Sequence, residues 1–306
     1  MIFQKSREFI YRNARPLELA LWKYYFENGS KQAVLEALSF YQNEDGGFGH
    51  ALEHDVWNPN SIPMGIWKAT TVLESIGFTD GSHPMIQGIL RFLDSGSCYD
   101  GEVGQWCGTV PTNNDFPHAV WWHYEEEKPE FGPNPTAALA GFIIAYAEKD
   151  SGIYKKGYDL AVRCFEQMLE SVSPVDMHDI SCYMQLYHYL VQCGEARLLD
   201  MAKFEECLIQ MVNESICKDI SQWGNSYVSL PSRFVKSRDS FLYAGVEDLV
   251  KAECKLIKEQ QLPDGSFKVP WSWCNDYKEF EVAKNWSKSE IIIEKMLFLK
   301  NFGELV

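Results

Sequence analysis

Apolar residues recur at three- and four-residue spacing along most of this chain, a pattern typical of helices that bury one face. In the segment 63–76, one face carries Ile66, Ala69, Leu73 and Ile76. No segment shows the sustained alternation of a half-buried strand. The pattern predicts about twelve helices, at residues 4–13, 15–28, 31–42, 63–76, 83–95, 134–149, 153–171, 177–193, 198–214, 238–246, 247–260 and 286–302.

The predicted helices alternate in character. A charged amphipathic helix leads through a loop rich in Gly, Pro and Trp to a more apolar helix, with a period of roughly 50 residues. The segment 137–147 is apolar all round, as expected of a helix packed on every side. Repeated helical hairpins indicate an all-α array, and twelve helices favour a closed ring of six hairpins, an (α/α)6 toroid, over an open solenoid. Because no linker interrupts the pattern, residues 1–306 are interpreted as a single domain.

Composition excludes several classes of function. The 306 residues include 28 Lys and Arg against 43 Asp and Glu, a net charge of −15. Such a surface repels phosphate backbones and anionic lipids, so neither nucleic acid nor membrane is an expected partner. The start of the chain mixes charges and does not resemble a signal peptide, which predicts a cytoplasmic location. Nine cysteines without a Cys-x-x-Cys pair predict reduced thiols.

Two loop segments carry a similar turn motif, Gln42-Asn-Glu-Asp-Gly-Gly-Phe-Gly and Gln260-Gln-Leu-Pro-Asp-Gly-Ser-Phe. Glycine supplies a positive φ, the aspartate accepts backbone hydrogen bonds, and the phenylalanine packs back into the hairpin. This reasoning predicts a structural role for the motif.

The two segments resemble the Gln-x-x-x-Asp-Gly-(Gly/Ser)-(Phe/Trp) repeats of the terpenoid cyclase and protein prenyltransferase superfamily. The resemblance implies an (α/α)6 toroid in which each motif ties an outer helix to the next inner one. It also implies a hydrophobic, isoprenoid-like substrate in a central aromatic cavity.

The catalytic motifs of that family are missing. A class II terpene cyclase would need Asp-x-Asp-Asp, and no two aspartates are adjacent in this chain. A prenyltransferase would need a zinc-binding histidine far downstream of its Asp and Cys, and the last histidine is His188. No metal or other cofactor is therefore predicted.

The strongest candidate chemistry lies between the first turn motif and the helix predicted at 63–76. Glu53 and Asp55 are interpreted as a catalytic acid and base, because burial can raise the pKa of one carboxyl group while the other stays ionised. His50, Trp57 and Asn58 are the neighbouring substrate-binding candidates. The alternative is structural, with Asp55 capping a helix and the histidines bonding to loop backbone.

Long loops at 43–62, 97–133, 215–237 and 261–285 are expected to gather at one rim and form a binding surface. They are rich in aromatic residues, which suit isoprenoids and sugars alike. The residues predicted to contact substrate there are Trp121, Trp122, His123, Trp223, Trp271 and Trp273. The alternative is that these rings fill the core.

A second cluster begins the helix predicted at 177–193. Asp176, His178, Asp179 and Cys182 could form a metal site, since His178 and Cys182 share a helix face. Capping of the helix by the carboxylates is the favoured interpretation.

Three hypotheses follow. The first is an enzyme that performs acid–base chemistry on an isoprenoid-like small molecule. The second is an (α/α)6 carbohydrate-active enzyme. The third is a non-catalytic protein that binds a small molecule or a peptide.

Overall fold

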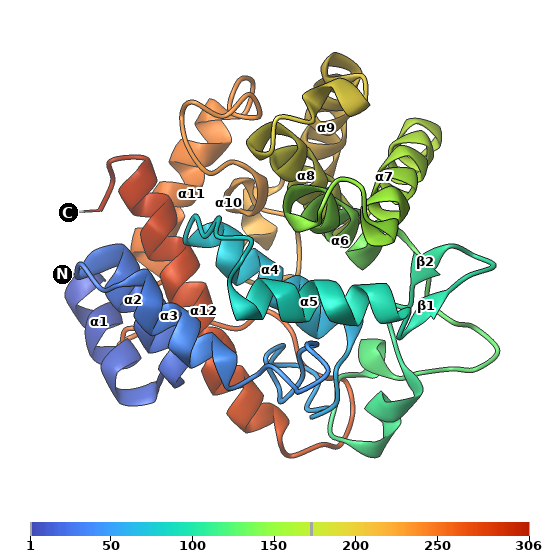
Figure 1. Ribbon diagram of the computed structural model, residues 1–306. Helices are drawn as coiled ribbons and strands as arrows, with labels where there is room; N and C mark the ends of the chain where they lie inside the picture. The colour runs from blue at the N-terminus through green and yellow to red at the C-terminus, as the bar shows by residue number, and fades with distance from the viewer. Residues whose placement is uncertain (1, 172–173, 306) are drawn as a thin grey trace. The chain divides into compact units, whose positions relative to one another are not determined.

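The computed structural model describes residues 2–171 and 174–305. Within these ranges the chain is mostly helical, with twelve α-helices and one two-stranded sheet (Figure 1). The all-helical expectation is confirmed apart from that small sheet. The chain divides into two compact units, which are named here the terminal unit (residues 1–38 and 212–306) and the middle unit (residues 39–211).

The terminal unit is built from both ends of the chain. Its helices are α1 (Ile2–Asn13), α2 (Pro16–Phe26), most of α3 (Lys31–Ser39), α10 (Pro231–Phe234), α11 (Glu247–Gln260) and α12 (Phe280–Asn301). Helix α12 packs against both α1 and α2. In the core of this unit Trp22 is fully buried, and its ring lies 5.0 Å from that of Phe3 and 4.5 Å from that of Phe26.

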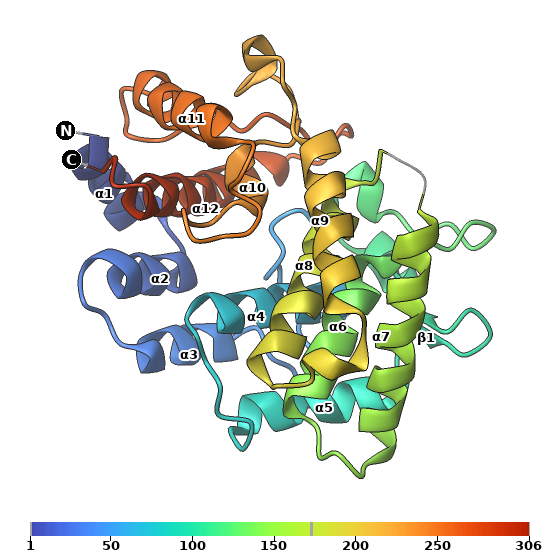
Figure 2. The same ribbon diagram turned by 90° about the horizontal axis from the view of Figure 1, so that it is seen from above.

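The middle unit centres on one largely buried helix. Its elements are α4 (Pro63–Ser75), α5 (Pro84–Ser95), β1 (Tyr99–Asp100), β2 (Gln105–Trp106), α6 (Pro133–Tyr146), α7 (Gly152–Glu170), α8 (Met177–Gln192) and most of α9 (Met201–Ser215). Helix α6 lies between α7 and α8 (Figure 2) and also contacts α4. Residues 135–144 are all buried, which confirms residues 137–144 of the predicted apolar segment as an enclosed helix; residues 145–147 are partly exposed.

Helix entries follow the sequence signals. Proline occupies the first turn of α2, α4, α5, α6 and α10, where its missing N–H costs nothing. The side chains of Ser151 and Asp176 cap α7 and α8 by accepting backbone N–H groups.

One predicted helix is wrong. Residues 238–246 form turns rather than a helix, and Gly245 adopts a φ of 91° there. Two of their apolar residues, Leu242 and Val246, are nevertheless buried in the core. The short helix α10 is not among the predicted helices. The predicted and observed numbers of helices agree because this additional helix offsets the missing one at 238–246.

The two turn motifs have the same structure. The Nε2 atom of Gln42 donates to the carbonyl oxygens of Gly46 (3.0 Å) and of Met85 (3.1 Å), the latter in the first turn of α5. The Nε2 atom of Gln261 donates to the carbonyl oxygens of Gly265 (3.1 Å) and Ile2 (2.9 Å), the latter in the first turn of α1. Gln261, rather than Gln260, is therefore the counterpart of Gln42.

Each motif glycine lies directly against a helix backbone. Gly46 has a φ of 95°, and a Cβ atom there would stand 2.0 Å from the carbonyl oxygen of Gly88 in α5. Gly265 has a φ of 92°, and its Cβ atom would stand 2.2 Å from the carbonyl oxygen of Lys5 in α1. The predicted structural role of the motifs is confirmed: each one docks a turn on a neighbouring helix.

Among the described residues, every helix is either too short or too polar to span a bilayer.

Replacing Gly46 by alanine tests this docking. We expect Gly46→Ala to lower the free energy of unfolding by about 3 kcal/mol or more, because a left-handed backbone and a clash with backbone atoms act together. Gly96→Ala is the matched control: Gly96 has a φ of 76° with nothing within 4 Å of the added Cβ atom, and its cost should be about 1 kcal/mol. Urea unfolding followed by circular dichroism measures both, and equal losses would contradict the docking.

Candidate functional site

Two loops of the middle unit that are far apart in sequence pair with each other. Val56 and His118 form an antiparallel bridge. On either side of it, the Trp57 N–H donates to the Pro117 carbonyl oxygen (2.9 Å) and the Ala119 N–H donates to the Asp55 carbonyl oxygen (2.8 Å). Residues 48–62 and 107–124 therefore form one connected structure, which we call the loop platform.

Asn58 ties the platform together from inside. Its side chain is fully buried, and its Nδ2 atom donates to Thr112 Oγ1 (2.8 Å) and Asn113 Oδ1 (3.0 Å). Its Oδ1 atom accepts from the backbone and side-chain nitrogens of Asn60, at 3.0 and 2.9 Å. Because donors and acceptor are all engaged, the Asn58 amide serves here to hold the two loops.

An apolar cluster supports the platform. Buried Val56, Ile62, Met64 and Val110 form its centre. The partly buried side chains packed against it are Trp67, Cys98, Cys107 and Trp122. Trp122, predicted to contact substrate, thus contributes much of its ring to internal packing, and the Asn113 side chain binds its carbonyl oxygen at 3.0 Å.

The Glu53 carboxylate is largely shielded from solvent but makes no hydrogen bond within the described ranges. Its side chain is 17% exposed, and its Oε2 atom lies 3.9 Å from Nζ of Lys68, which is 16% exposed. The Glu53 carboxylate makes no hydrogen bond to any residue of the described ranges. An ion pair at this distance leaves the oxygens of the carboxylate available to a substrate.

Asp55 has a different setting from Glu53. Its side chain is buried, and its backbone carbonyl oxygen takes part in the pairing of the loops. The neighbouring His54 is also buried, and its carbonyl oxygen accepts from Nε1 of Trp57 at 3.0 Å. Of the two predicted catalytic carboxylates, Glu53 is the more accessible one.

Histidines occupy both loops of the platform. His50 is exposed, has a φ of 56°, and its Nε2 atom lies 2.8 Å from Asn43 Oδ1. His118 is buried, and its Nε2 atom lies 3.1 Å from Nδ1 of the exposed His123. Trp121 stands beside this pair in the sequence with 38% of its surface exposed.

The predicted site residues fall into two groups. Glu53, Asp55, His50, Trp57, Asn58, Trp121, Trp122 and His123 belong to the middle unit. Trp223, Trp271 and Trp273 belong to the terminal unit. There, Trp223 and Trp273 are fully buried, Trp223 donates to the Cys217 carbonyl oxygen (2.9 Å), and the Trp271 ring lies 5.7 Å from that of Tyr227. Trp223 and Trp273 are thus core side chains of their own unit.

The cluster at the start of α8 follows the capping interpretation. The Asp176 carboxylate accepts from the backbone N–H of His178 (2.8 Å) and also lies 2.9 Å from its Nδ1 atom. Burial raises the pKa of Asp179 to about 6, with a further contribution from the charge of Asp176. In the described ranges, no three His, Cys, Asp or Glu side chains are grouped so that they could hold a metal ion.

Sequence reasoning missed three side chains. Lys68 belongs to no recognisable sequence motif, and only the 3.9 Å distance from its Nζ atom to Glu53 Oε2 makes it a candidate. His118 could have been noticed from its five-residue spacing to His123. Glu74 of α4 lies 3.1 Å from Nδ1 of His188 in α8, a contact that nothing in the sequence signals.

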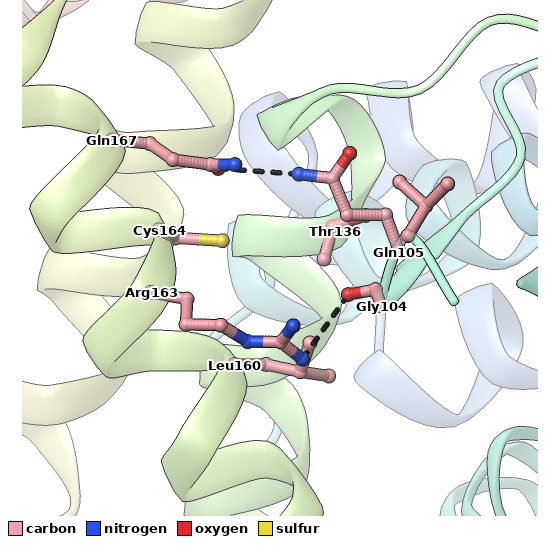
Figure 3. Close-up of a pocket in the computed structure, with 8 residues that line it drawn as sticks. Gly104, Gln105, Thr136, Leu160, Arg163, Cys164 and Gln167 are labelled. Carbon is pink, nitrogen blue, oxygen red and sulfur yellow. Dashed lines mark hydrogen bonds between the residues drawn. The ribbon is translucent and has the colours of Figure 1, made fainter. Parts of the chain in front are cut away.

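A small cavity lies between α7, the hairpin and the start of α6 (Figure 3). Its volume is about 20 Å³, which suits a single water molecule rather than a substrate. Gln105 and Gln167 are joined by a hydrogen bond of 3.1 Å at its wall, and Arg163 donates to the Gly104 carbonyl oxygen at 3.4 Å. Burial raises the pKa of the Cys164 thiol there to about 12, so the thiol stays protonated.

Comparisons of this chain with models of protein families, with curated proteins and with solved structures find no match.

The raised pKa of Asp179 predicts a pH dependence of stability. The folded state holds this proton more tightly than the unfolded state, whose pKa is near 3.8. The contribution of Asp179 is therefore present below about pH 4 and is lost as the pH rises through 6.

We expect the wild type to lose about 1 to 2 kcal/mol more stability than Asp179→Asn between pH 4 and pH 7, after discounting for solvent access. Urea unfolding at both pH values measures this difference. Asp159→Asn, which changes an exposed carboxylate of α7, is the control and should follow the wild type. Parallel behaviour of wild type and Asp179→Asn would contradict the assignment.

Proposed function

We propose that this protein is an enzyme that performs acid–base chemistry on a small molecule, with Glu53 as the group that accepts and returns the proton. The observation that carries this proposal is the state of the Glu53 carboxylate: 17% exposed, 3.9 Å from Lys68, and without a hydrogen bond to any described residue. A shielded carboxylate ordinarily has its oxygens satisfied. One that is left open can bind the reacting group of a substrate.

Lys68 favours one direction of chemistry. Its ammonium group would stabilise negative charge that develops on a substrate bound at Glu53, and it would disfavour a carbocation at the same place. Proton abstraction from a hydroxyl group, or from a C–H bond beside a carbonyl group, therefore fits this pair better than generation of a cation. The proton moves to a Glu53 oxygen while the bonding electrons stay on the substrate, and its return completes an isomerisation or an exchange.

The substrate proposed here has a hydrophobic, isoprenoid-like body. Trp57 and Trp121 present aromatic surface on the same loop platform as Glu53, and aromatic faces bind such chains well. The resemblance of the turn motifs to those of the terpenoid cyclase and prenyltransferase toroids supports the same substrate class.

The (α/α)6 toroid is part of this proposal. The first motif follows α3, leads to α4 and docks on the following helix α5. The second motif follows α11, leads to α12 and docks on α1, the first helix of the chain. Helix α1 thus takes the place of the next outer helix, and contact between the last hairpin and the first helix is what a closed ring requires.

Solvent exchange tests the chemistry without knowledge of the product. We would incubate the protein in D₂O with farnesal, geranylacetone and squalene, and measure deuterium incorporation by mass spectrometry. We expect incorporation into a prenyl carbonyl compound, lowered about 10²-fold or more in Glu53→Gln, because the amide cannot accept the proton. Glu126→Gln, which changes an exposed carboxylate of the middle unit, should leave the rate unchanged.

The other outcomes are equally decisive. Full incorporation by Glu53→Gln would remove Glu53 from the reaction. Hydrolysis of p-nitrophenyl glycosides in place of exchange would favour the carbohydrate-active alternative. Saturable binding of these compounds without exchange would favour a non-catalytic binding protein.

A further inference from the structure

The hydrogen bonds of His118 determine where its proton lies. Its Nδ1 atom is 2.6 Å from the Phe116 carbonyl oxygen, which can only accept a hydrogen bond. The Nδ1 atom must therefore carry a hydrogen. In the neutral ring, Nε2 is then left with a lone pair.

The same reasoning extends to His123. Its Nδ1 atom lies 3.1 Å from His118 Nε2, so the hydrogen between the two atoms belongs to His123 Nδ1. The ring planes are 15° apart, and the centroids are separated by 5.3 Å. The distance between the centroids exceeds the N···N distance by about two ring radii, so the two rings lie end to end. The hydrogen bond therefore lies near both ring planes, as favourable hydrogen-bond geometry requires.

The consequence is an exposed lone pair on Nε2 of His123. This ring lies at the surface, and its Nε2 atom has no partner in the described ranges. A neutral histidine side chain in water prefers the hydrogen on Nε2, so the tautomer inferred here is the minor one, and the hydrogen bond to His118 imposes it. A neutral imidazole with an accessible Nε2 atom is the form that acts as a general base.

The support of this base is rigid. His118 is buried and paired across the platform with Val56, next to Asp55. A 3₁₀ turn, η2 (Val120–Trp122), joins the two histidines, with the Trp122 N–H bonded to the Ala119 carbonyl oxygen at 2.8 Å. Pre-organisation of this kind removes the cost of orienting the base during reaction.

We propose that His123 is a second proton acceptor of this enzyme, held in its Nδ1–H tautomer by the positioning residue His118. An O–H bond, or a C–H bond beside a carbonyl group, breaks and its proton joins Nε2 of His123, while the electron pair stays on the substrate. The Nδ1 proton of His123 then moves to Nε2 of His118, whose imidazolium form keeps its bond to Phe116. Reversal of both transfers returns the proton, so no co-reactant is consumed.

The catalytic role rests on the proposed function, whereas the tautomer does not. The first experiment therefore needs no substrate: two-bond ¹H–¹⁵N correlation spectra of the full ¹⁵N-labelled chain at neutral pH, with the His123 signals assigned by their loss in His123→Gln. We expect the hydrogen of His123 on Nδ1 in the wild type and on Nε2 in His118→Phe. His118→Gln, whose carbonyl oxygen can accept in place of the ring nitrogen, should restore the Nδ1 form.

His83 serves as an internal reference for the opposite tautomer. The Nδ1 atom of His83 accepts the backbone N–H of Met85 at 3.2 Å, so neutral His83 must carry its hydrogen on Nε2. Its spectrum should show that opposite tautomer in every variant. A wild-type His123 with its hydrogen on Nε2, or a His123 tautomer that does not respond to His118→Phe, would overturn the proposal.

Activity separates the two proposals. In the deuterium assay we expect His118→Phe to lower kcat about 10-fold or more with little change in KM, and His118→Gln to recover most of it. If the wild type has the Nδ1–H tautomer but His123→Gln keeps full activity, the catalytic role of His123 is overturned while the tautomer assignment stands. Loss of exchange in Glu53→Gln would still uphold the proposed function in that case.

Discussion

The close contact of a turn glycine with a helix backbone is the constraint on which the candidate site depends. At Gly46 the turn comes so near to Gly88 that a single added carbon atom would not fit. This approach lets the Gln42 side chain bond to the turn and to α5 together, and it brings Phe48 into the core. The chain then enters the loop platform from a fixed point. Because the same arrangement occurs at Gly265, it is a repeated device of the fold rather than an accident of one loop.

The platform shows how long loops can be ordered without regular secondary structure. The two backbone hydrogen bonds of the Val56–His118 bridge and two of the four hydrogen bonds of Asn58 join segments that lie 54 to 64 residues apart in the sequence. Each hydrogen bond contributes about 1 kcal/mol, but breaking one would leave a buried group unsatisfied at a larger cost. The loops are therefore held cooperatively. In this platform, the Glu53 carboxylate and the Nε2 atom of His123 are exceptions, because they are accessible to solvent and make no hydrogen bond to a described residue.

These two exceptions differ in kind. Glu53 is a shielded carboxylate next to an ammonium group, whereas His123 is an exposed imidazole supported by a second imidazole. Both can accept a proton, and neither needs a metal ion to do so. The buried tryptophans of the terminal unit, Trp223 and Trp273, are core side chains. The cavity beside Arg163 has room for about one water molecule. The chemistry that we propose accordingly involves residues of the platform rather than the tryptophans of the terminal unit.

Local interactions explain what the sequence by itself determined. Helical periodicity, proline at helix entries, the enclosed α6 and the glycine turns all depend on residues a few positions apart, and each was predicted. The exception at 238–246 arose because periodic apolar residues can be buried by turns as well as by a helix. The partners of Asn58 and the approach of Lys68 to Glu53 were decided by tertiary structure alone. Each of them depends on where a distant segment returns, and short-range patterns carry no information about that.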